Sequence, residues 1–177
     1  MCLLTRGFNQ RAACRNGIGG IRSVLIAGFD AIGTIGKDAS GNVSGFSASG
    51  TPFYEYAVTP ETANFVETLT ANEQNGSLFY EQVFTLVLNN MSQTKRNEIK
   101  VLAQKRLAII AVNENGTRSL LGETYGVIAN GGTIGTGTAK GDRNGYSITF
   151  MAREADPSPH VLEAATTGKI SATSSTE

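Results

Sequence analysis

The most regular pattern of apolar and polar positions runs over residues 64–124. It predicts, in order, a strand, a turn, a long strand, a helix, a strand, a turn and a strand. Within the long strand, residues 77–89 alternate with a period of two, and the more apolar face is expected to point into the core. That face carries Tyr80, Gln82, Phe84, Leu86 and Leu88. The opposite face is mixed, and it is expected to meet solvent or a neighbouring subunit.

The strand before this one covers residues 64–70, and the two are predicted to form a hairpin. Asn75-Gly76 between them is typical of a turn that needs a positive φ. The longer arm would span about thirteen residues, whereas a typical strand has ~5–6. A hairpin that extends beyond one core needs a partner to cover it.

The predicted helix covers residues 92–106, with Ser92 as its N-cap. Ile99, Leu102 and Ala103 follow the spacing of a buried helical face. The rest of the helix is basic, and Lys105 and Arg106 are expected in its last turn, where they would complement the helix dipole. Residues 107–113 (LAIIAVN) then form a strand too apolar for an exposed edge, followed by a turn and a further strand.

Shorter strands are predicted at residues 24–26, 43–46 and 53–58, and a last strand at 146–154 places Tyr146, Ile148 and Phe150 on its core side. Residues 129–145 are predicted to be a long Gly/Thr loop. The expected organisation is an N-terminal arm (1–17), a single β domain (18–158) and a flexible C-terminal tail (159–177).

Composition supports a mainly β, α+β class. Charged residues are only 17% of the 177 residues and 21 are glycine, which favours strands and loops over helices. Fifteen basic and fifteen acidic residues cancel. Zero net charge weakly favours assembly and disfavours a dedicated nucleic-acid-binding protein.

The charges are unevenly distributed. Between Lys37 and Lys95 there is no Lys or Arg, so the predicted hairpin is purely acidic, whereas the helix after it is basic. Opposite charges on adjacent elements would fix which surfaces pair between subunits. Two ordinary solvated faces are the alternative explanation.

Candidate chemistry is sparse. Gly36-Lys37 is followed by Asp38 and fits no Walker loop, and the glycines near residue 137 do not open a helix. His160, the only histidine, has no carboxylate set around it that would make it a general base. Glu67 and Glu81 could face each other across the hairpin like a glycosidase pair, although such acids are commonly just solvated.

Other functional classes find little support. No carboxylate cluster suggests a metal, and Cys2 and Cys14 match no zinc motif. No apolar run has the ~18 residues of a membrane span, and a signal peptide is not expected. We therefore expect no enzyme activity, no cofactor, no metal and no membrane association.

Three stretches carry a resemblance to a known family. They are residues 14–21 (CRNGIGGI), residues 75–82 (NGSLFYEQ) with the strand and helix that follow, and residues 139–150 (AKGDRNGYSITF). In this order and spacing the chain resembles tail-tube-like virion proteins of crAss-like phages and their relatives, over most of residues 14–156.

The resemblance implies a β-sandwich or half-barrel with one flanking helix and a long β-hairpin. Such subunits form ring homo-oligomers, six- or twelve-fold, in a tail tube or in the tail barrel of a short tail. Their neighbours are other tail or portal-proximal proteins. They are located in the virion tail after assembly in the host cytoplasm, and DNA passes through the lumen without specific binding.

From the acidic hairpin we expect Glu67, Glu73 and Glu81 to approach the lumen, because a channel that repels phosphate does not retain DNA. From the basic helix we expect Lys95, Arg96, Lys100 and Lys105 to contact neighbouring subunits. The arm 1–17 and the loop 129–145 are expected to join subunits or rings. The alternative function is a monomeric receptor- or carbohydrate-binding β-sandwich (an adhesin or head decoration) that uses the aromatic run at 53–56. A hydrolase has the least support.

Overall fold

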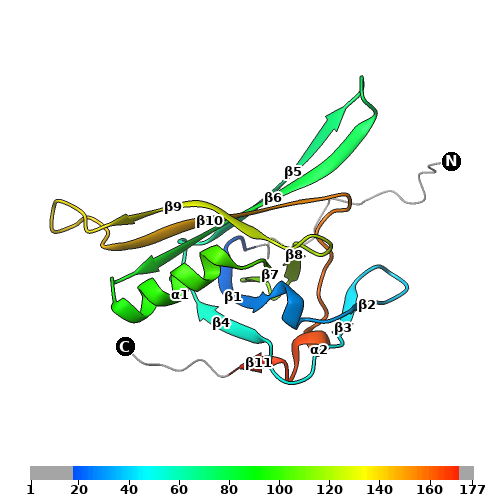
Figure 1. Ribbon diagram of the computed structural model, residues 1–177, viewed down its shortest axis with the longest axis horizontal. Helices are drawn as coiled ribbons and strands as arrows, with labels where there is room; N and C mark the ends of the chain where they lie inside the picture. Colours follow the sequence, from blue (N-terminus) through cyan, green and yellow to red (C-terminus); the bar gives the residue numbers. More distant parts are fainter. Residues whose placement is uncertain (1–17, 172–177) are drawn as a thin grey trace.

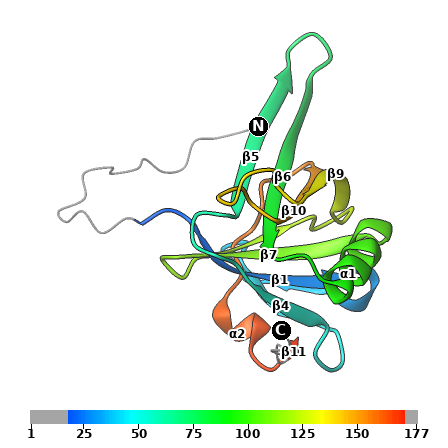
Figure 2. The same ribbon diagram turned by 90° about the vertical axis from the view of Figure 1, so that its left-hand side faces the viewer.

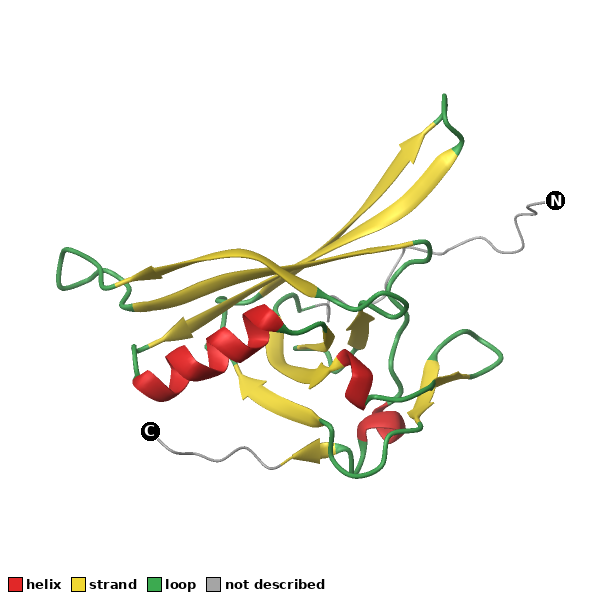
Figure 3. Cartoon of the chain, viewed as in Figure 1, coloured by secondary structure: helices red, strands yellow, loops and turns green. Residues whose placement is uncertain are grey.

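The protein folds into two packed β-sheets and a short two-stranded ribbon (Figures 1 and 3). The structure is a computed structural model that describes residues 18–171. The five-stranded sheet has the order β11-β4-β1-β7-β8, the four-stranded sheet β5-β6-β10-β9, and the ribbon is β2-β3. This confirms the mainly β, α+β class.

The bounds of the elements are as follows. The strands are β1 (Ile21–Gly28), β2 (Ile35–Lys37), β3 (Val43–Phe46), β4 (Phe53–Ala57), β5 (Asn64–Asn72), β6 (Ser77–Asn89), β7 (Leu107–Asn113), β8 (Arg118–Leu121), β9 (Ile128–Gly135), β10 (Gly145–Glu154) and β11 (Ile170–Ser171). The helices are η1 (Phe29–Ala31), α1 (Gln93–Gln104) and α2 (Glu163–Thr166).

The five-stranded sheet is buried on both faces. Along β7, Leu107, Ile109 and Ala111 pack into the cluster between the two sheets, while the residues between them pack into a second cluster on the far side. This double burial explains why residues 107–112 are apolar without alternation.

The four-stranded sheet buries one face only, as the alternation along residues 77–89 predicted. Phe84 and Leu86 of β6 and Phe150 of β10 are fully buried in the cluster between the sheets. The rings of Phe84 and Phe150 stack with their centroids 6.5 Å apart. This contact fixes the long hairpin to the rest of the fold.

Helix α1 begins as predicted and ends earlier. The Ser92 Oγ accepts a hydrogen bond from the Lys95 amide at 3.2 Å, which confirms the N-cap. Leu102 is buried and Ile99 packs beside it, but Ala103 is exposed because only a narrow stripe of the helix meets the sandwich. The helix ends at Gln104, so Lys105 and Arg106 are not in its last turn, and that prediction is wrong.

Part of the predicted Gly/Thr loop is a strand. Residues 128–135 form β9, which pairs with β10, and only residues 136–144 connect the two. A Cβ on Gly132 would lie 2.7 Å from the Ser147 carbonyl oxygen. Here the glycine allows two backbones to approach closely, whereas the sequence pattern alone suggested a loop.

Residues 159–171 are folded, which corrects the predicted flexible tail over that range. The Val161 amide donates to the Arg118 carbonyl, and the Leu162 amide donates to the Val43 carbonyl, each at 2.9 Å. Val161 and Ala165 are buried in the second core cluster, and β11 pairs with β4. The segment therefore covers the outer face of the five-stranded sheet. Residues 1–17, the predicted arm, and residues 172–177 lie outside the described range.

Tyr56 of β4 ties the five-stranded sheet to α1. Its hydroxyl donates to Glu98 Oε1 at 2.6 Å, and burial together with this hydrogen bond raises the pKa of Tyr56 above its ordinary value of 10.0. The folded state thus holds the phenol proton more tightly than the unfolded state does. The resulting stabilisation is complete below pH 10 and is lost as the pH rises through the raised pKa.

Tyr56→Phe is therefore expected to lower the free energy of unfolding by about 1 kcal/mol at neutral pH. The difference from the wild type should shrink above pH 10. Urea denaturation at several pH values measures both effects, with the exposed Tyr54→Phe as the matched control. A difference between wild type and Tyr56→Phe that stays constant through pH 11 would contradict the assigned hydrogen bond.

Candidate functional site

The most conspicuous surface is the outer face of the four-stranded sheet, the face turned away from the core. No described element lies over it in Figures 1 and 2. Its side chains are mostly Thr, Val and Ser, and strand register places them together. They are Val66, Thr68 and Thr70 of β5, Phe79, Glu81, Val83, Thr85 and Val87 of β6, Ser147, Thr149, Met151 and Arg153 of β10, and Ile128 and Thr133 of β9.

This outer face is nearly uncharged. Among the described residues of its strands, only Glu81 and Arg153 point onto it with a charge, and they pair across β6 and β10 with Nε to Oε2 at 3.4 Å. Val66 and Ile128 remain about half exposed. A broad, neutral sheet face of this kind is suited to contact rather than to acid–base chemistry.

The β5–β6 hairpin projects beyond the sandwich (Figure 2). The ladder between β10 and β6 ends at the pair Glu154 and Tyr80, whereas the hairpin continues to its turn at residues 73–76. On the projecting part, Leu69 is 56% exposed and Leu78 is 54% exposed. Both lie on the side that is continuous with the core face, where the described chain places nothing beneath them. The predicted length of the longer arm is confirmed, since β6 has 13 residues.

The three predicted lumen carboxylates do not share one face. The register pairs Glu67 with Gln82 and Glu81 with Thr68, which puts Glu67 on the core side and Glu81 on the outer face. They therefore cannot face each other across the hairpin, and the glycosidase-like pair is ruled out. Glu73 lies in the exposed turn.

Glu67 instead joins the hairpin to a distant segment. Its Oε1 accepts hydrogen bonds from the Ser158 amide at 2.7 Å and from Gln82 Nε2 at 3.0 Å. Gln82 is only 1% exposed, and its Oε1 accepts from the Gly122 amide at 3.0 Å. The only sequence signal for this network is a glutamine at a core position of an otherwise apolar strand face.

The four predicted inter-subunit cations lie on or beside α1. Lys95 Nζ donates to the carbonyls of Asn89 and Asn90 at 2.8 and 3.2 Å, so it closes the turn before the helix. Arg96 contacts the Met91 sulfur at 3.9 Å. Lys100 and Lys105 are exposed. The helix therefore presents Arg96 and Lys100 to solvent, whereas Lys95 is turned to the backbone before the helix.

The glycine-rich loops are held by their own side chains. Asp142 Oδ2 accepts from the amides of Thr138 and Ala139, both at 2.8 Å, and these bonds lower the pKa of Asp142. Lys37 forms an ion pair with Glu123 at 2.6 Å.

In the chain from 18 to 171, no group of three or more His, Cys, Asp or Glu residues could hold a metal. None of the described helices is both long and apolar enough to cross a membrane.

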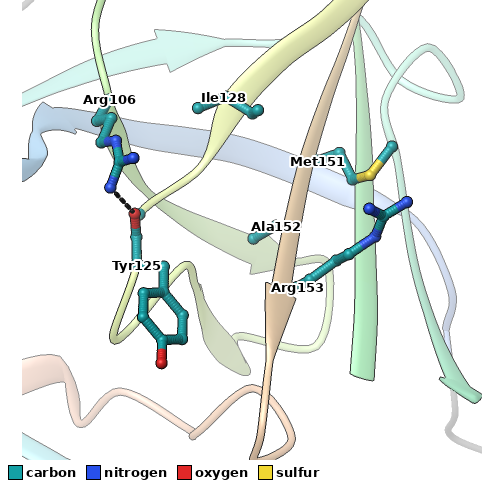
Figure 4. A pocket seen from close by; sticks show the side chains of 7 residues that line it. Arg106, Tyr125, Ile128, Met151, Ala152 and Arg153 are labelled. Carbon is teal, nitrogen blue, oxygen red and sulfur yellow. Dashed lines mark hydrogen bonds between the residues drawn. The ribbon is translucent and has the colours of Figure 1, made fainter. Parts of the chain in front are cut away.

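A groove of about 330 Å³ opens where β9 begins and β10 ends (Figure 4). Ala152 and Gly126 are among its lining residues, together with the partly apolar side chains of Tyr125, Ile128 and Met151, and Arg106 and Arg153 lie on either side of it. Arg106 Nη1 donates to the Tyr125 carbonyl at 3.2 Å. This site could not be predicted from the sequence, because Arg106 and Arg153 come from segments far apart in the chain.

Comparison with known proteins adds no relative. No family model, no curated protein and no solved structure matches the chain. The surfaces described above must therefore support any function by themselves.

Proposed function

We propose that this chain is a structural subunit of a tailed-phage virion, which assembles into rings of a tail tube or tail barrel and forms a passive conduit for DNA. The β5–β6 hairpin carries the proposal. It extends beyond its own sandwich and exposes Leu69 and Leu78. A second copy of the chain would bury the exposed half of each side chain, which would contribute about half of the ~1.5–3 kcal/mol of complete burial.

The free edges of the four-stranded sheet support ring formation. Strands β5 and β9 lie at opposite edges, and within residues 18–171 neither has a second partner strand. Contact between one edge of a subunit and the other edge of the next is a head-to-tail interface, which closes into a ring when the rotation permits. Closing the sheet into a barrel removes both edges.

The outer face of the sheet would then line the channel. It offers hydroxyl and aliphatic groups, and its one exposed cation, Arg153, is paired with Glu81. Because every neutralised phosphate adds affinity, a lining without free Lys or Arg does not hold DNA. Of the predicted lumen carboxylates, Glu81 points onto this face, Glu67 faces the other way, and Glu73 lies in the turn beyond the paired strands. The proposed subunit uses no cofactor and catalyses no reaction.

The receptor- or carbohydrate-binding alternative finds no aromatic platform. In the 53–56 run, Phe53 is fully buried and Tyr56 is held by Glu98, so that Tyr54 is the one broadly exposed ring. A sugar-binding surface usually presents aromatic faces together. The hairpin observation therefore favours assembly over this alternative.

Removing the projecting part of the hairpin is expected to abolish assembly. Replacing residues 70–79 with Asn-Gly keeps the pair Leu69 and Tyr80 next to a two-residue turn. Light scattering should give the wild type the mass of a ring or tube. It should give the variant the mass of a monomer, slightly below the wild-type chain mass of 18.6 kDa. Circular dichroism should show that the variant remains folded.

The matched control shortens the other hairpin, by replacing residues 38–42 between β2 and β3 with Asn-Gly; this variant should still assemble. A wild type that remains monomeric would contradict the proposal. So would a cryo-EM reconstruction that places the β5–β6 hairpin on the outer surface of the ring.

A further inference from the structure

The hairpin and the arginine-flanked groove are complementary surfaces at opposite edges of one sheet. The groove consists of Arg106, Tyr125, Gly126, Ile128, Met151, Ala152 and Arg153 and lies at the β9 edge. The hairpin, residues 64–89, contains the β5 edge. Because the width of the sheet separates the two surfaces, the hairpin does not fill the groove of its own chain. The groove is therefore open to the hairpin of a second copy.

The charges of the two surfaces are opposite. The hairpin contains three carboxylates and no Lys or Arg. Two of the carboxylates have partners, because Glu67 binds Ser158 and Glu81 binds Arg153. The side chain of Glu73, in the exposed turn, makes no hydrogen bond or ion pair with any residue from 18 to 171, so its carboxylate is available to a partner.

The groove offers cations for that carboxylate. Arg153 has a side chain that is 63% exposed, and its contact with Glu81 at 3.4 Å is long and solvent-screened. Arg106 is exposed and has one protein acceptor, the Tyr125 carbonyl. Guanidinium groups have five N–H donors, so both side chains can donate to a further carboxylate.

The apolar parts also match. Leu69 and Leu78 are exposed on the hairpin, and Tyr125 and Ile128 are exposed in the groove, at 59% and 52%. Together they supply an apolar contact beside a polar one, the usual composition of a protein interface. Glycine at position 126 could hold no larger side chain without contacting Phe29, which keeps the groove open at this point.

We propose that the β5–β6 hairpin of one copy docks in the arginine-flanked groove of the next, with Glu73 between Arg106 and Arg153. This inference rests on the proposed ring, for which it names the contact that sets subunit order. The contact is head-to-tail, so each copy contributes a hairpin on one side and a groove on the other.

A charge exchange tests the contact in the full chain. Glu73→Arg places like charges in the interface, as does Arg106→Glu, and each variant alone should assemble at least about tenfold more weakly than wild type. An equimolar mixture should assemble again. In an alternating ring, Arg at 73 of one variant meets Glu at 106 of the other, while the second interface is wild type in both residues.

Sedimentation velocity measures the assembly, and thermal melting checks that each variant folds. Glu114→Arg is the matched control, an exposed charge reversal in the β7–β8 turn, at the end of β7 opposite Arg106, and it should assemble like wild type. If wild type assembles and the single variants do too, the docking inference is overturned and the ring proposal stands. Single variants that fail to assemble even when mixed also overturn the inference. A monomeric wild type overturns both.

Discussion

Phe84→Ala is expected to lower the free energy of unfolding by about 3–5 kcal/mol. Phe84 is fully buried between the two sheets, where its ring stacks on Phe150. Truncation removes the transfer free energy of the ring and leaves a cavity that β6 and β10 cannot close, because their ladder holds them in register. Urea denaturation followed by circular dichroism measures the loss.

Phe79→Ala on the same strand is the matched control. Phe79 lies on the opposite, uncovered face and is only half-buried, so its truncation should cost the isolated subunit less than about 1 kcal/mol. If the two variants were equally destabilised, the assignment of the core face of β6 would be wrong. In the proposed ring, Phe79→Ala would still alter the channel lining.

Gln82→Leu is expected to cost about 2–3 kcal/mol of folding stability, even though leucine is apolar and of similar size. The Gly122 amide would lose its acceptor, and Glu67 would lose the Gln82 amide donor. A buried donor without a partner carries its full desolvation penalty. Denaturation of the purified variant gives the value directly.

Gln74→Leu makes the same chemical change in the exposed turn of the same hairpin, and it should leave stability nearly unchanged. A neutral Gln82→Leu would show that the glutamine bridge between hairpin and β8–β9 loop adds nothing to the fold. The hydrogen bonds of Glu67 to Gln82 and Ser158 would then contribute nothing to stability through Gln82.

Elements with local periodicity could be predicted from the sequence. The alternation along β6 is visible because one of its faces packs on Phe150 and its neighbours while the other is uncovered. Ser92 is identifiable as a cap because its side chain bonds to an amide only three residues away. In both cases the physical cause lies within a few residues or in a simple two-sided environment.

Elements that depend on distant partners were missed. β9 contains four polar or glycine residues in succession with little strand propensity, and it exists because β10 supplies its hydrogen bonds. Residues 159–171 fold because Val43 and Arg118, far away in sequence, supply backbone partners. No periodicity within those segments records such contacts.

The candidate site was predicted in part. The acidic hairpin and its unusual length follow from the sequence, but the face of each carboxylate depends on register, which separates Glu67 from Glu81. The groove could not be predicted, since Arg106 reaches it through the bridge between Leu107 and Val127, whereas Arg153 comes from β10, the partner strand of β9. The acidic composition identifies the hairpin as a distinct surface, whereas the strand register decides which side chains lie next to each of its carboxylates.

The register of β9 shifts opposite Thr149 and Phe150, which pair with Gly131 and Ala129 and leave Asn130 as an extra residue. Such a bulge twists an edge strand and interrupts its row of free backbone groups. An incoming strand can therefore match β9 on only one side of Asn130 at a time, and slipping by two residues would break the match. In the proposed ring, the bulge would thus restrict an edge that could otherwise template open-ended, amyloid-like growth to a partner strand at a defined offset.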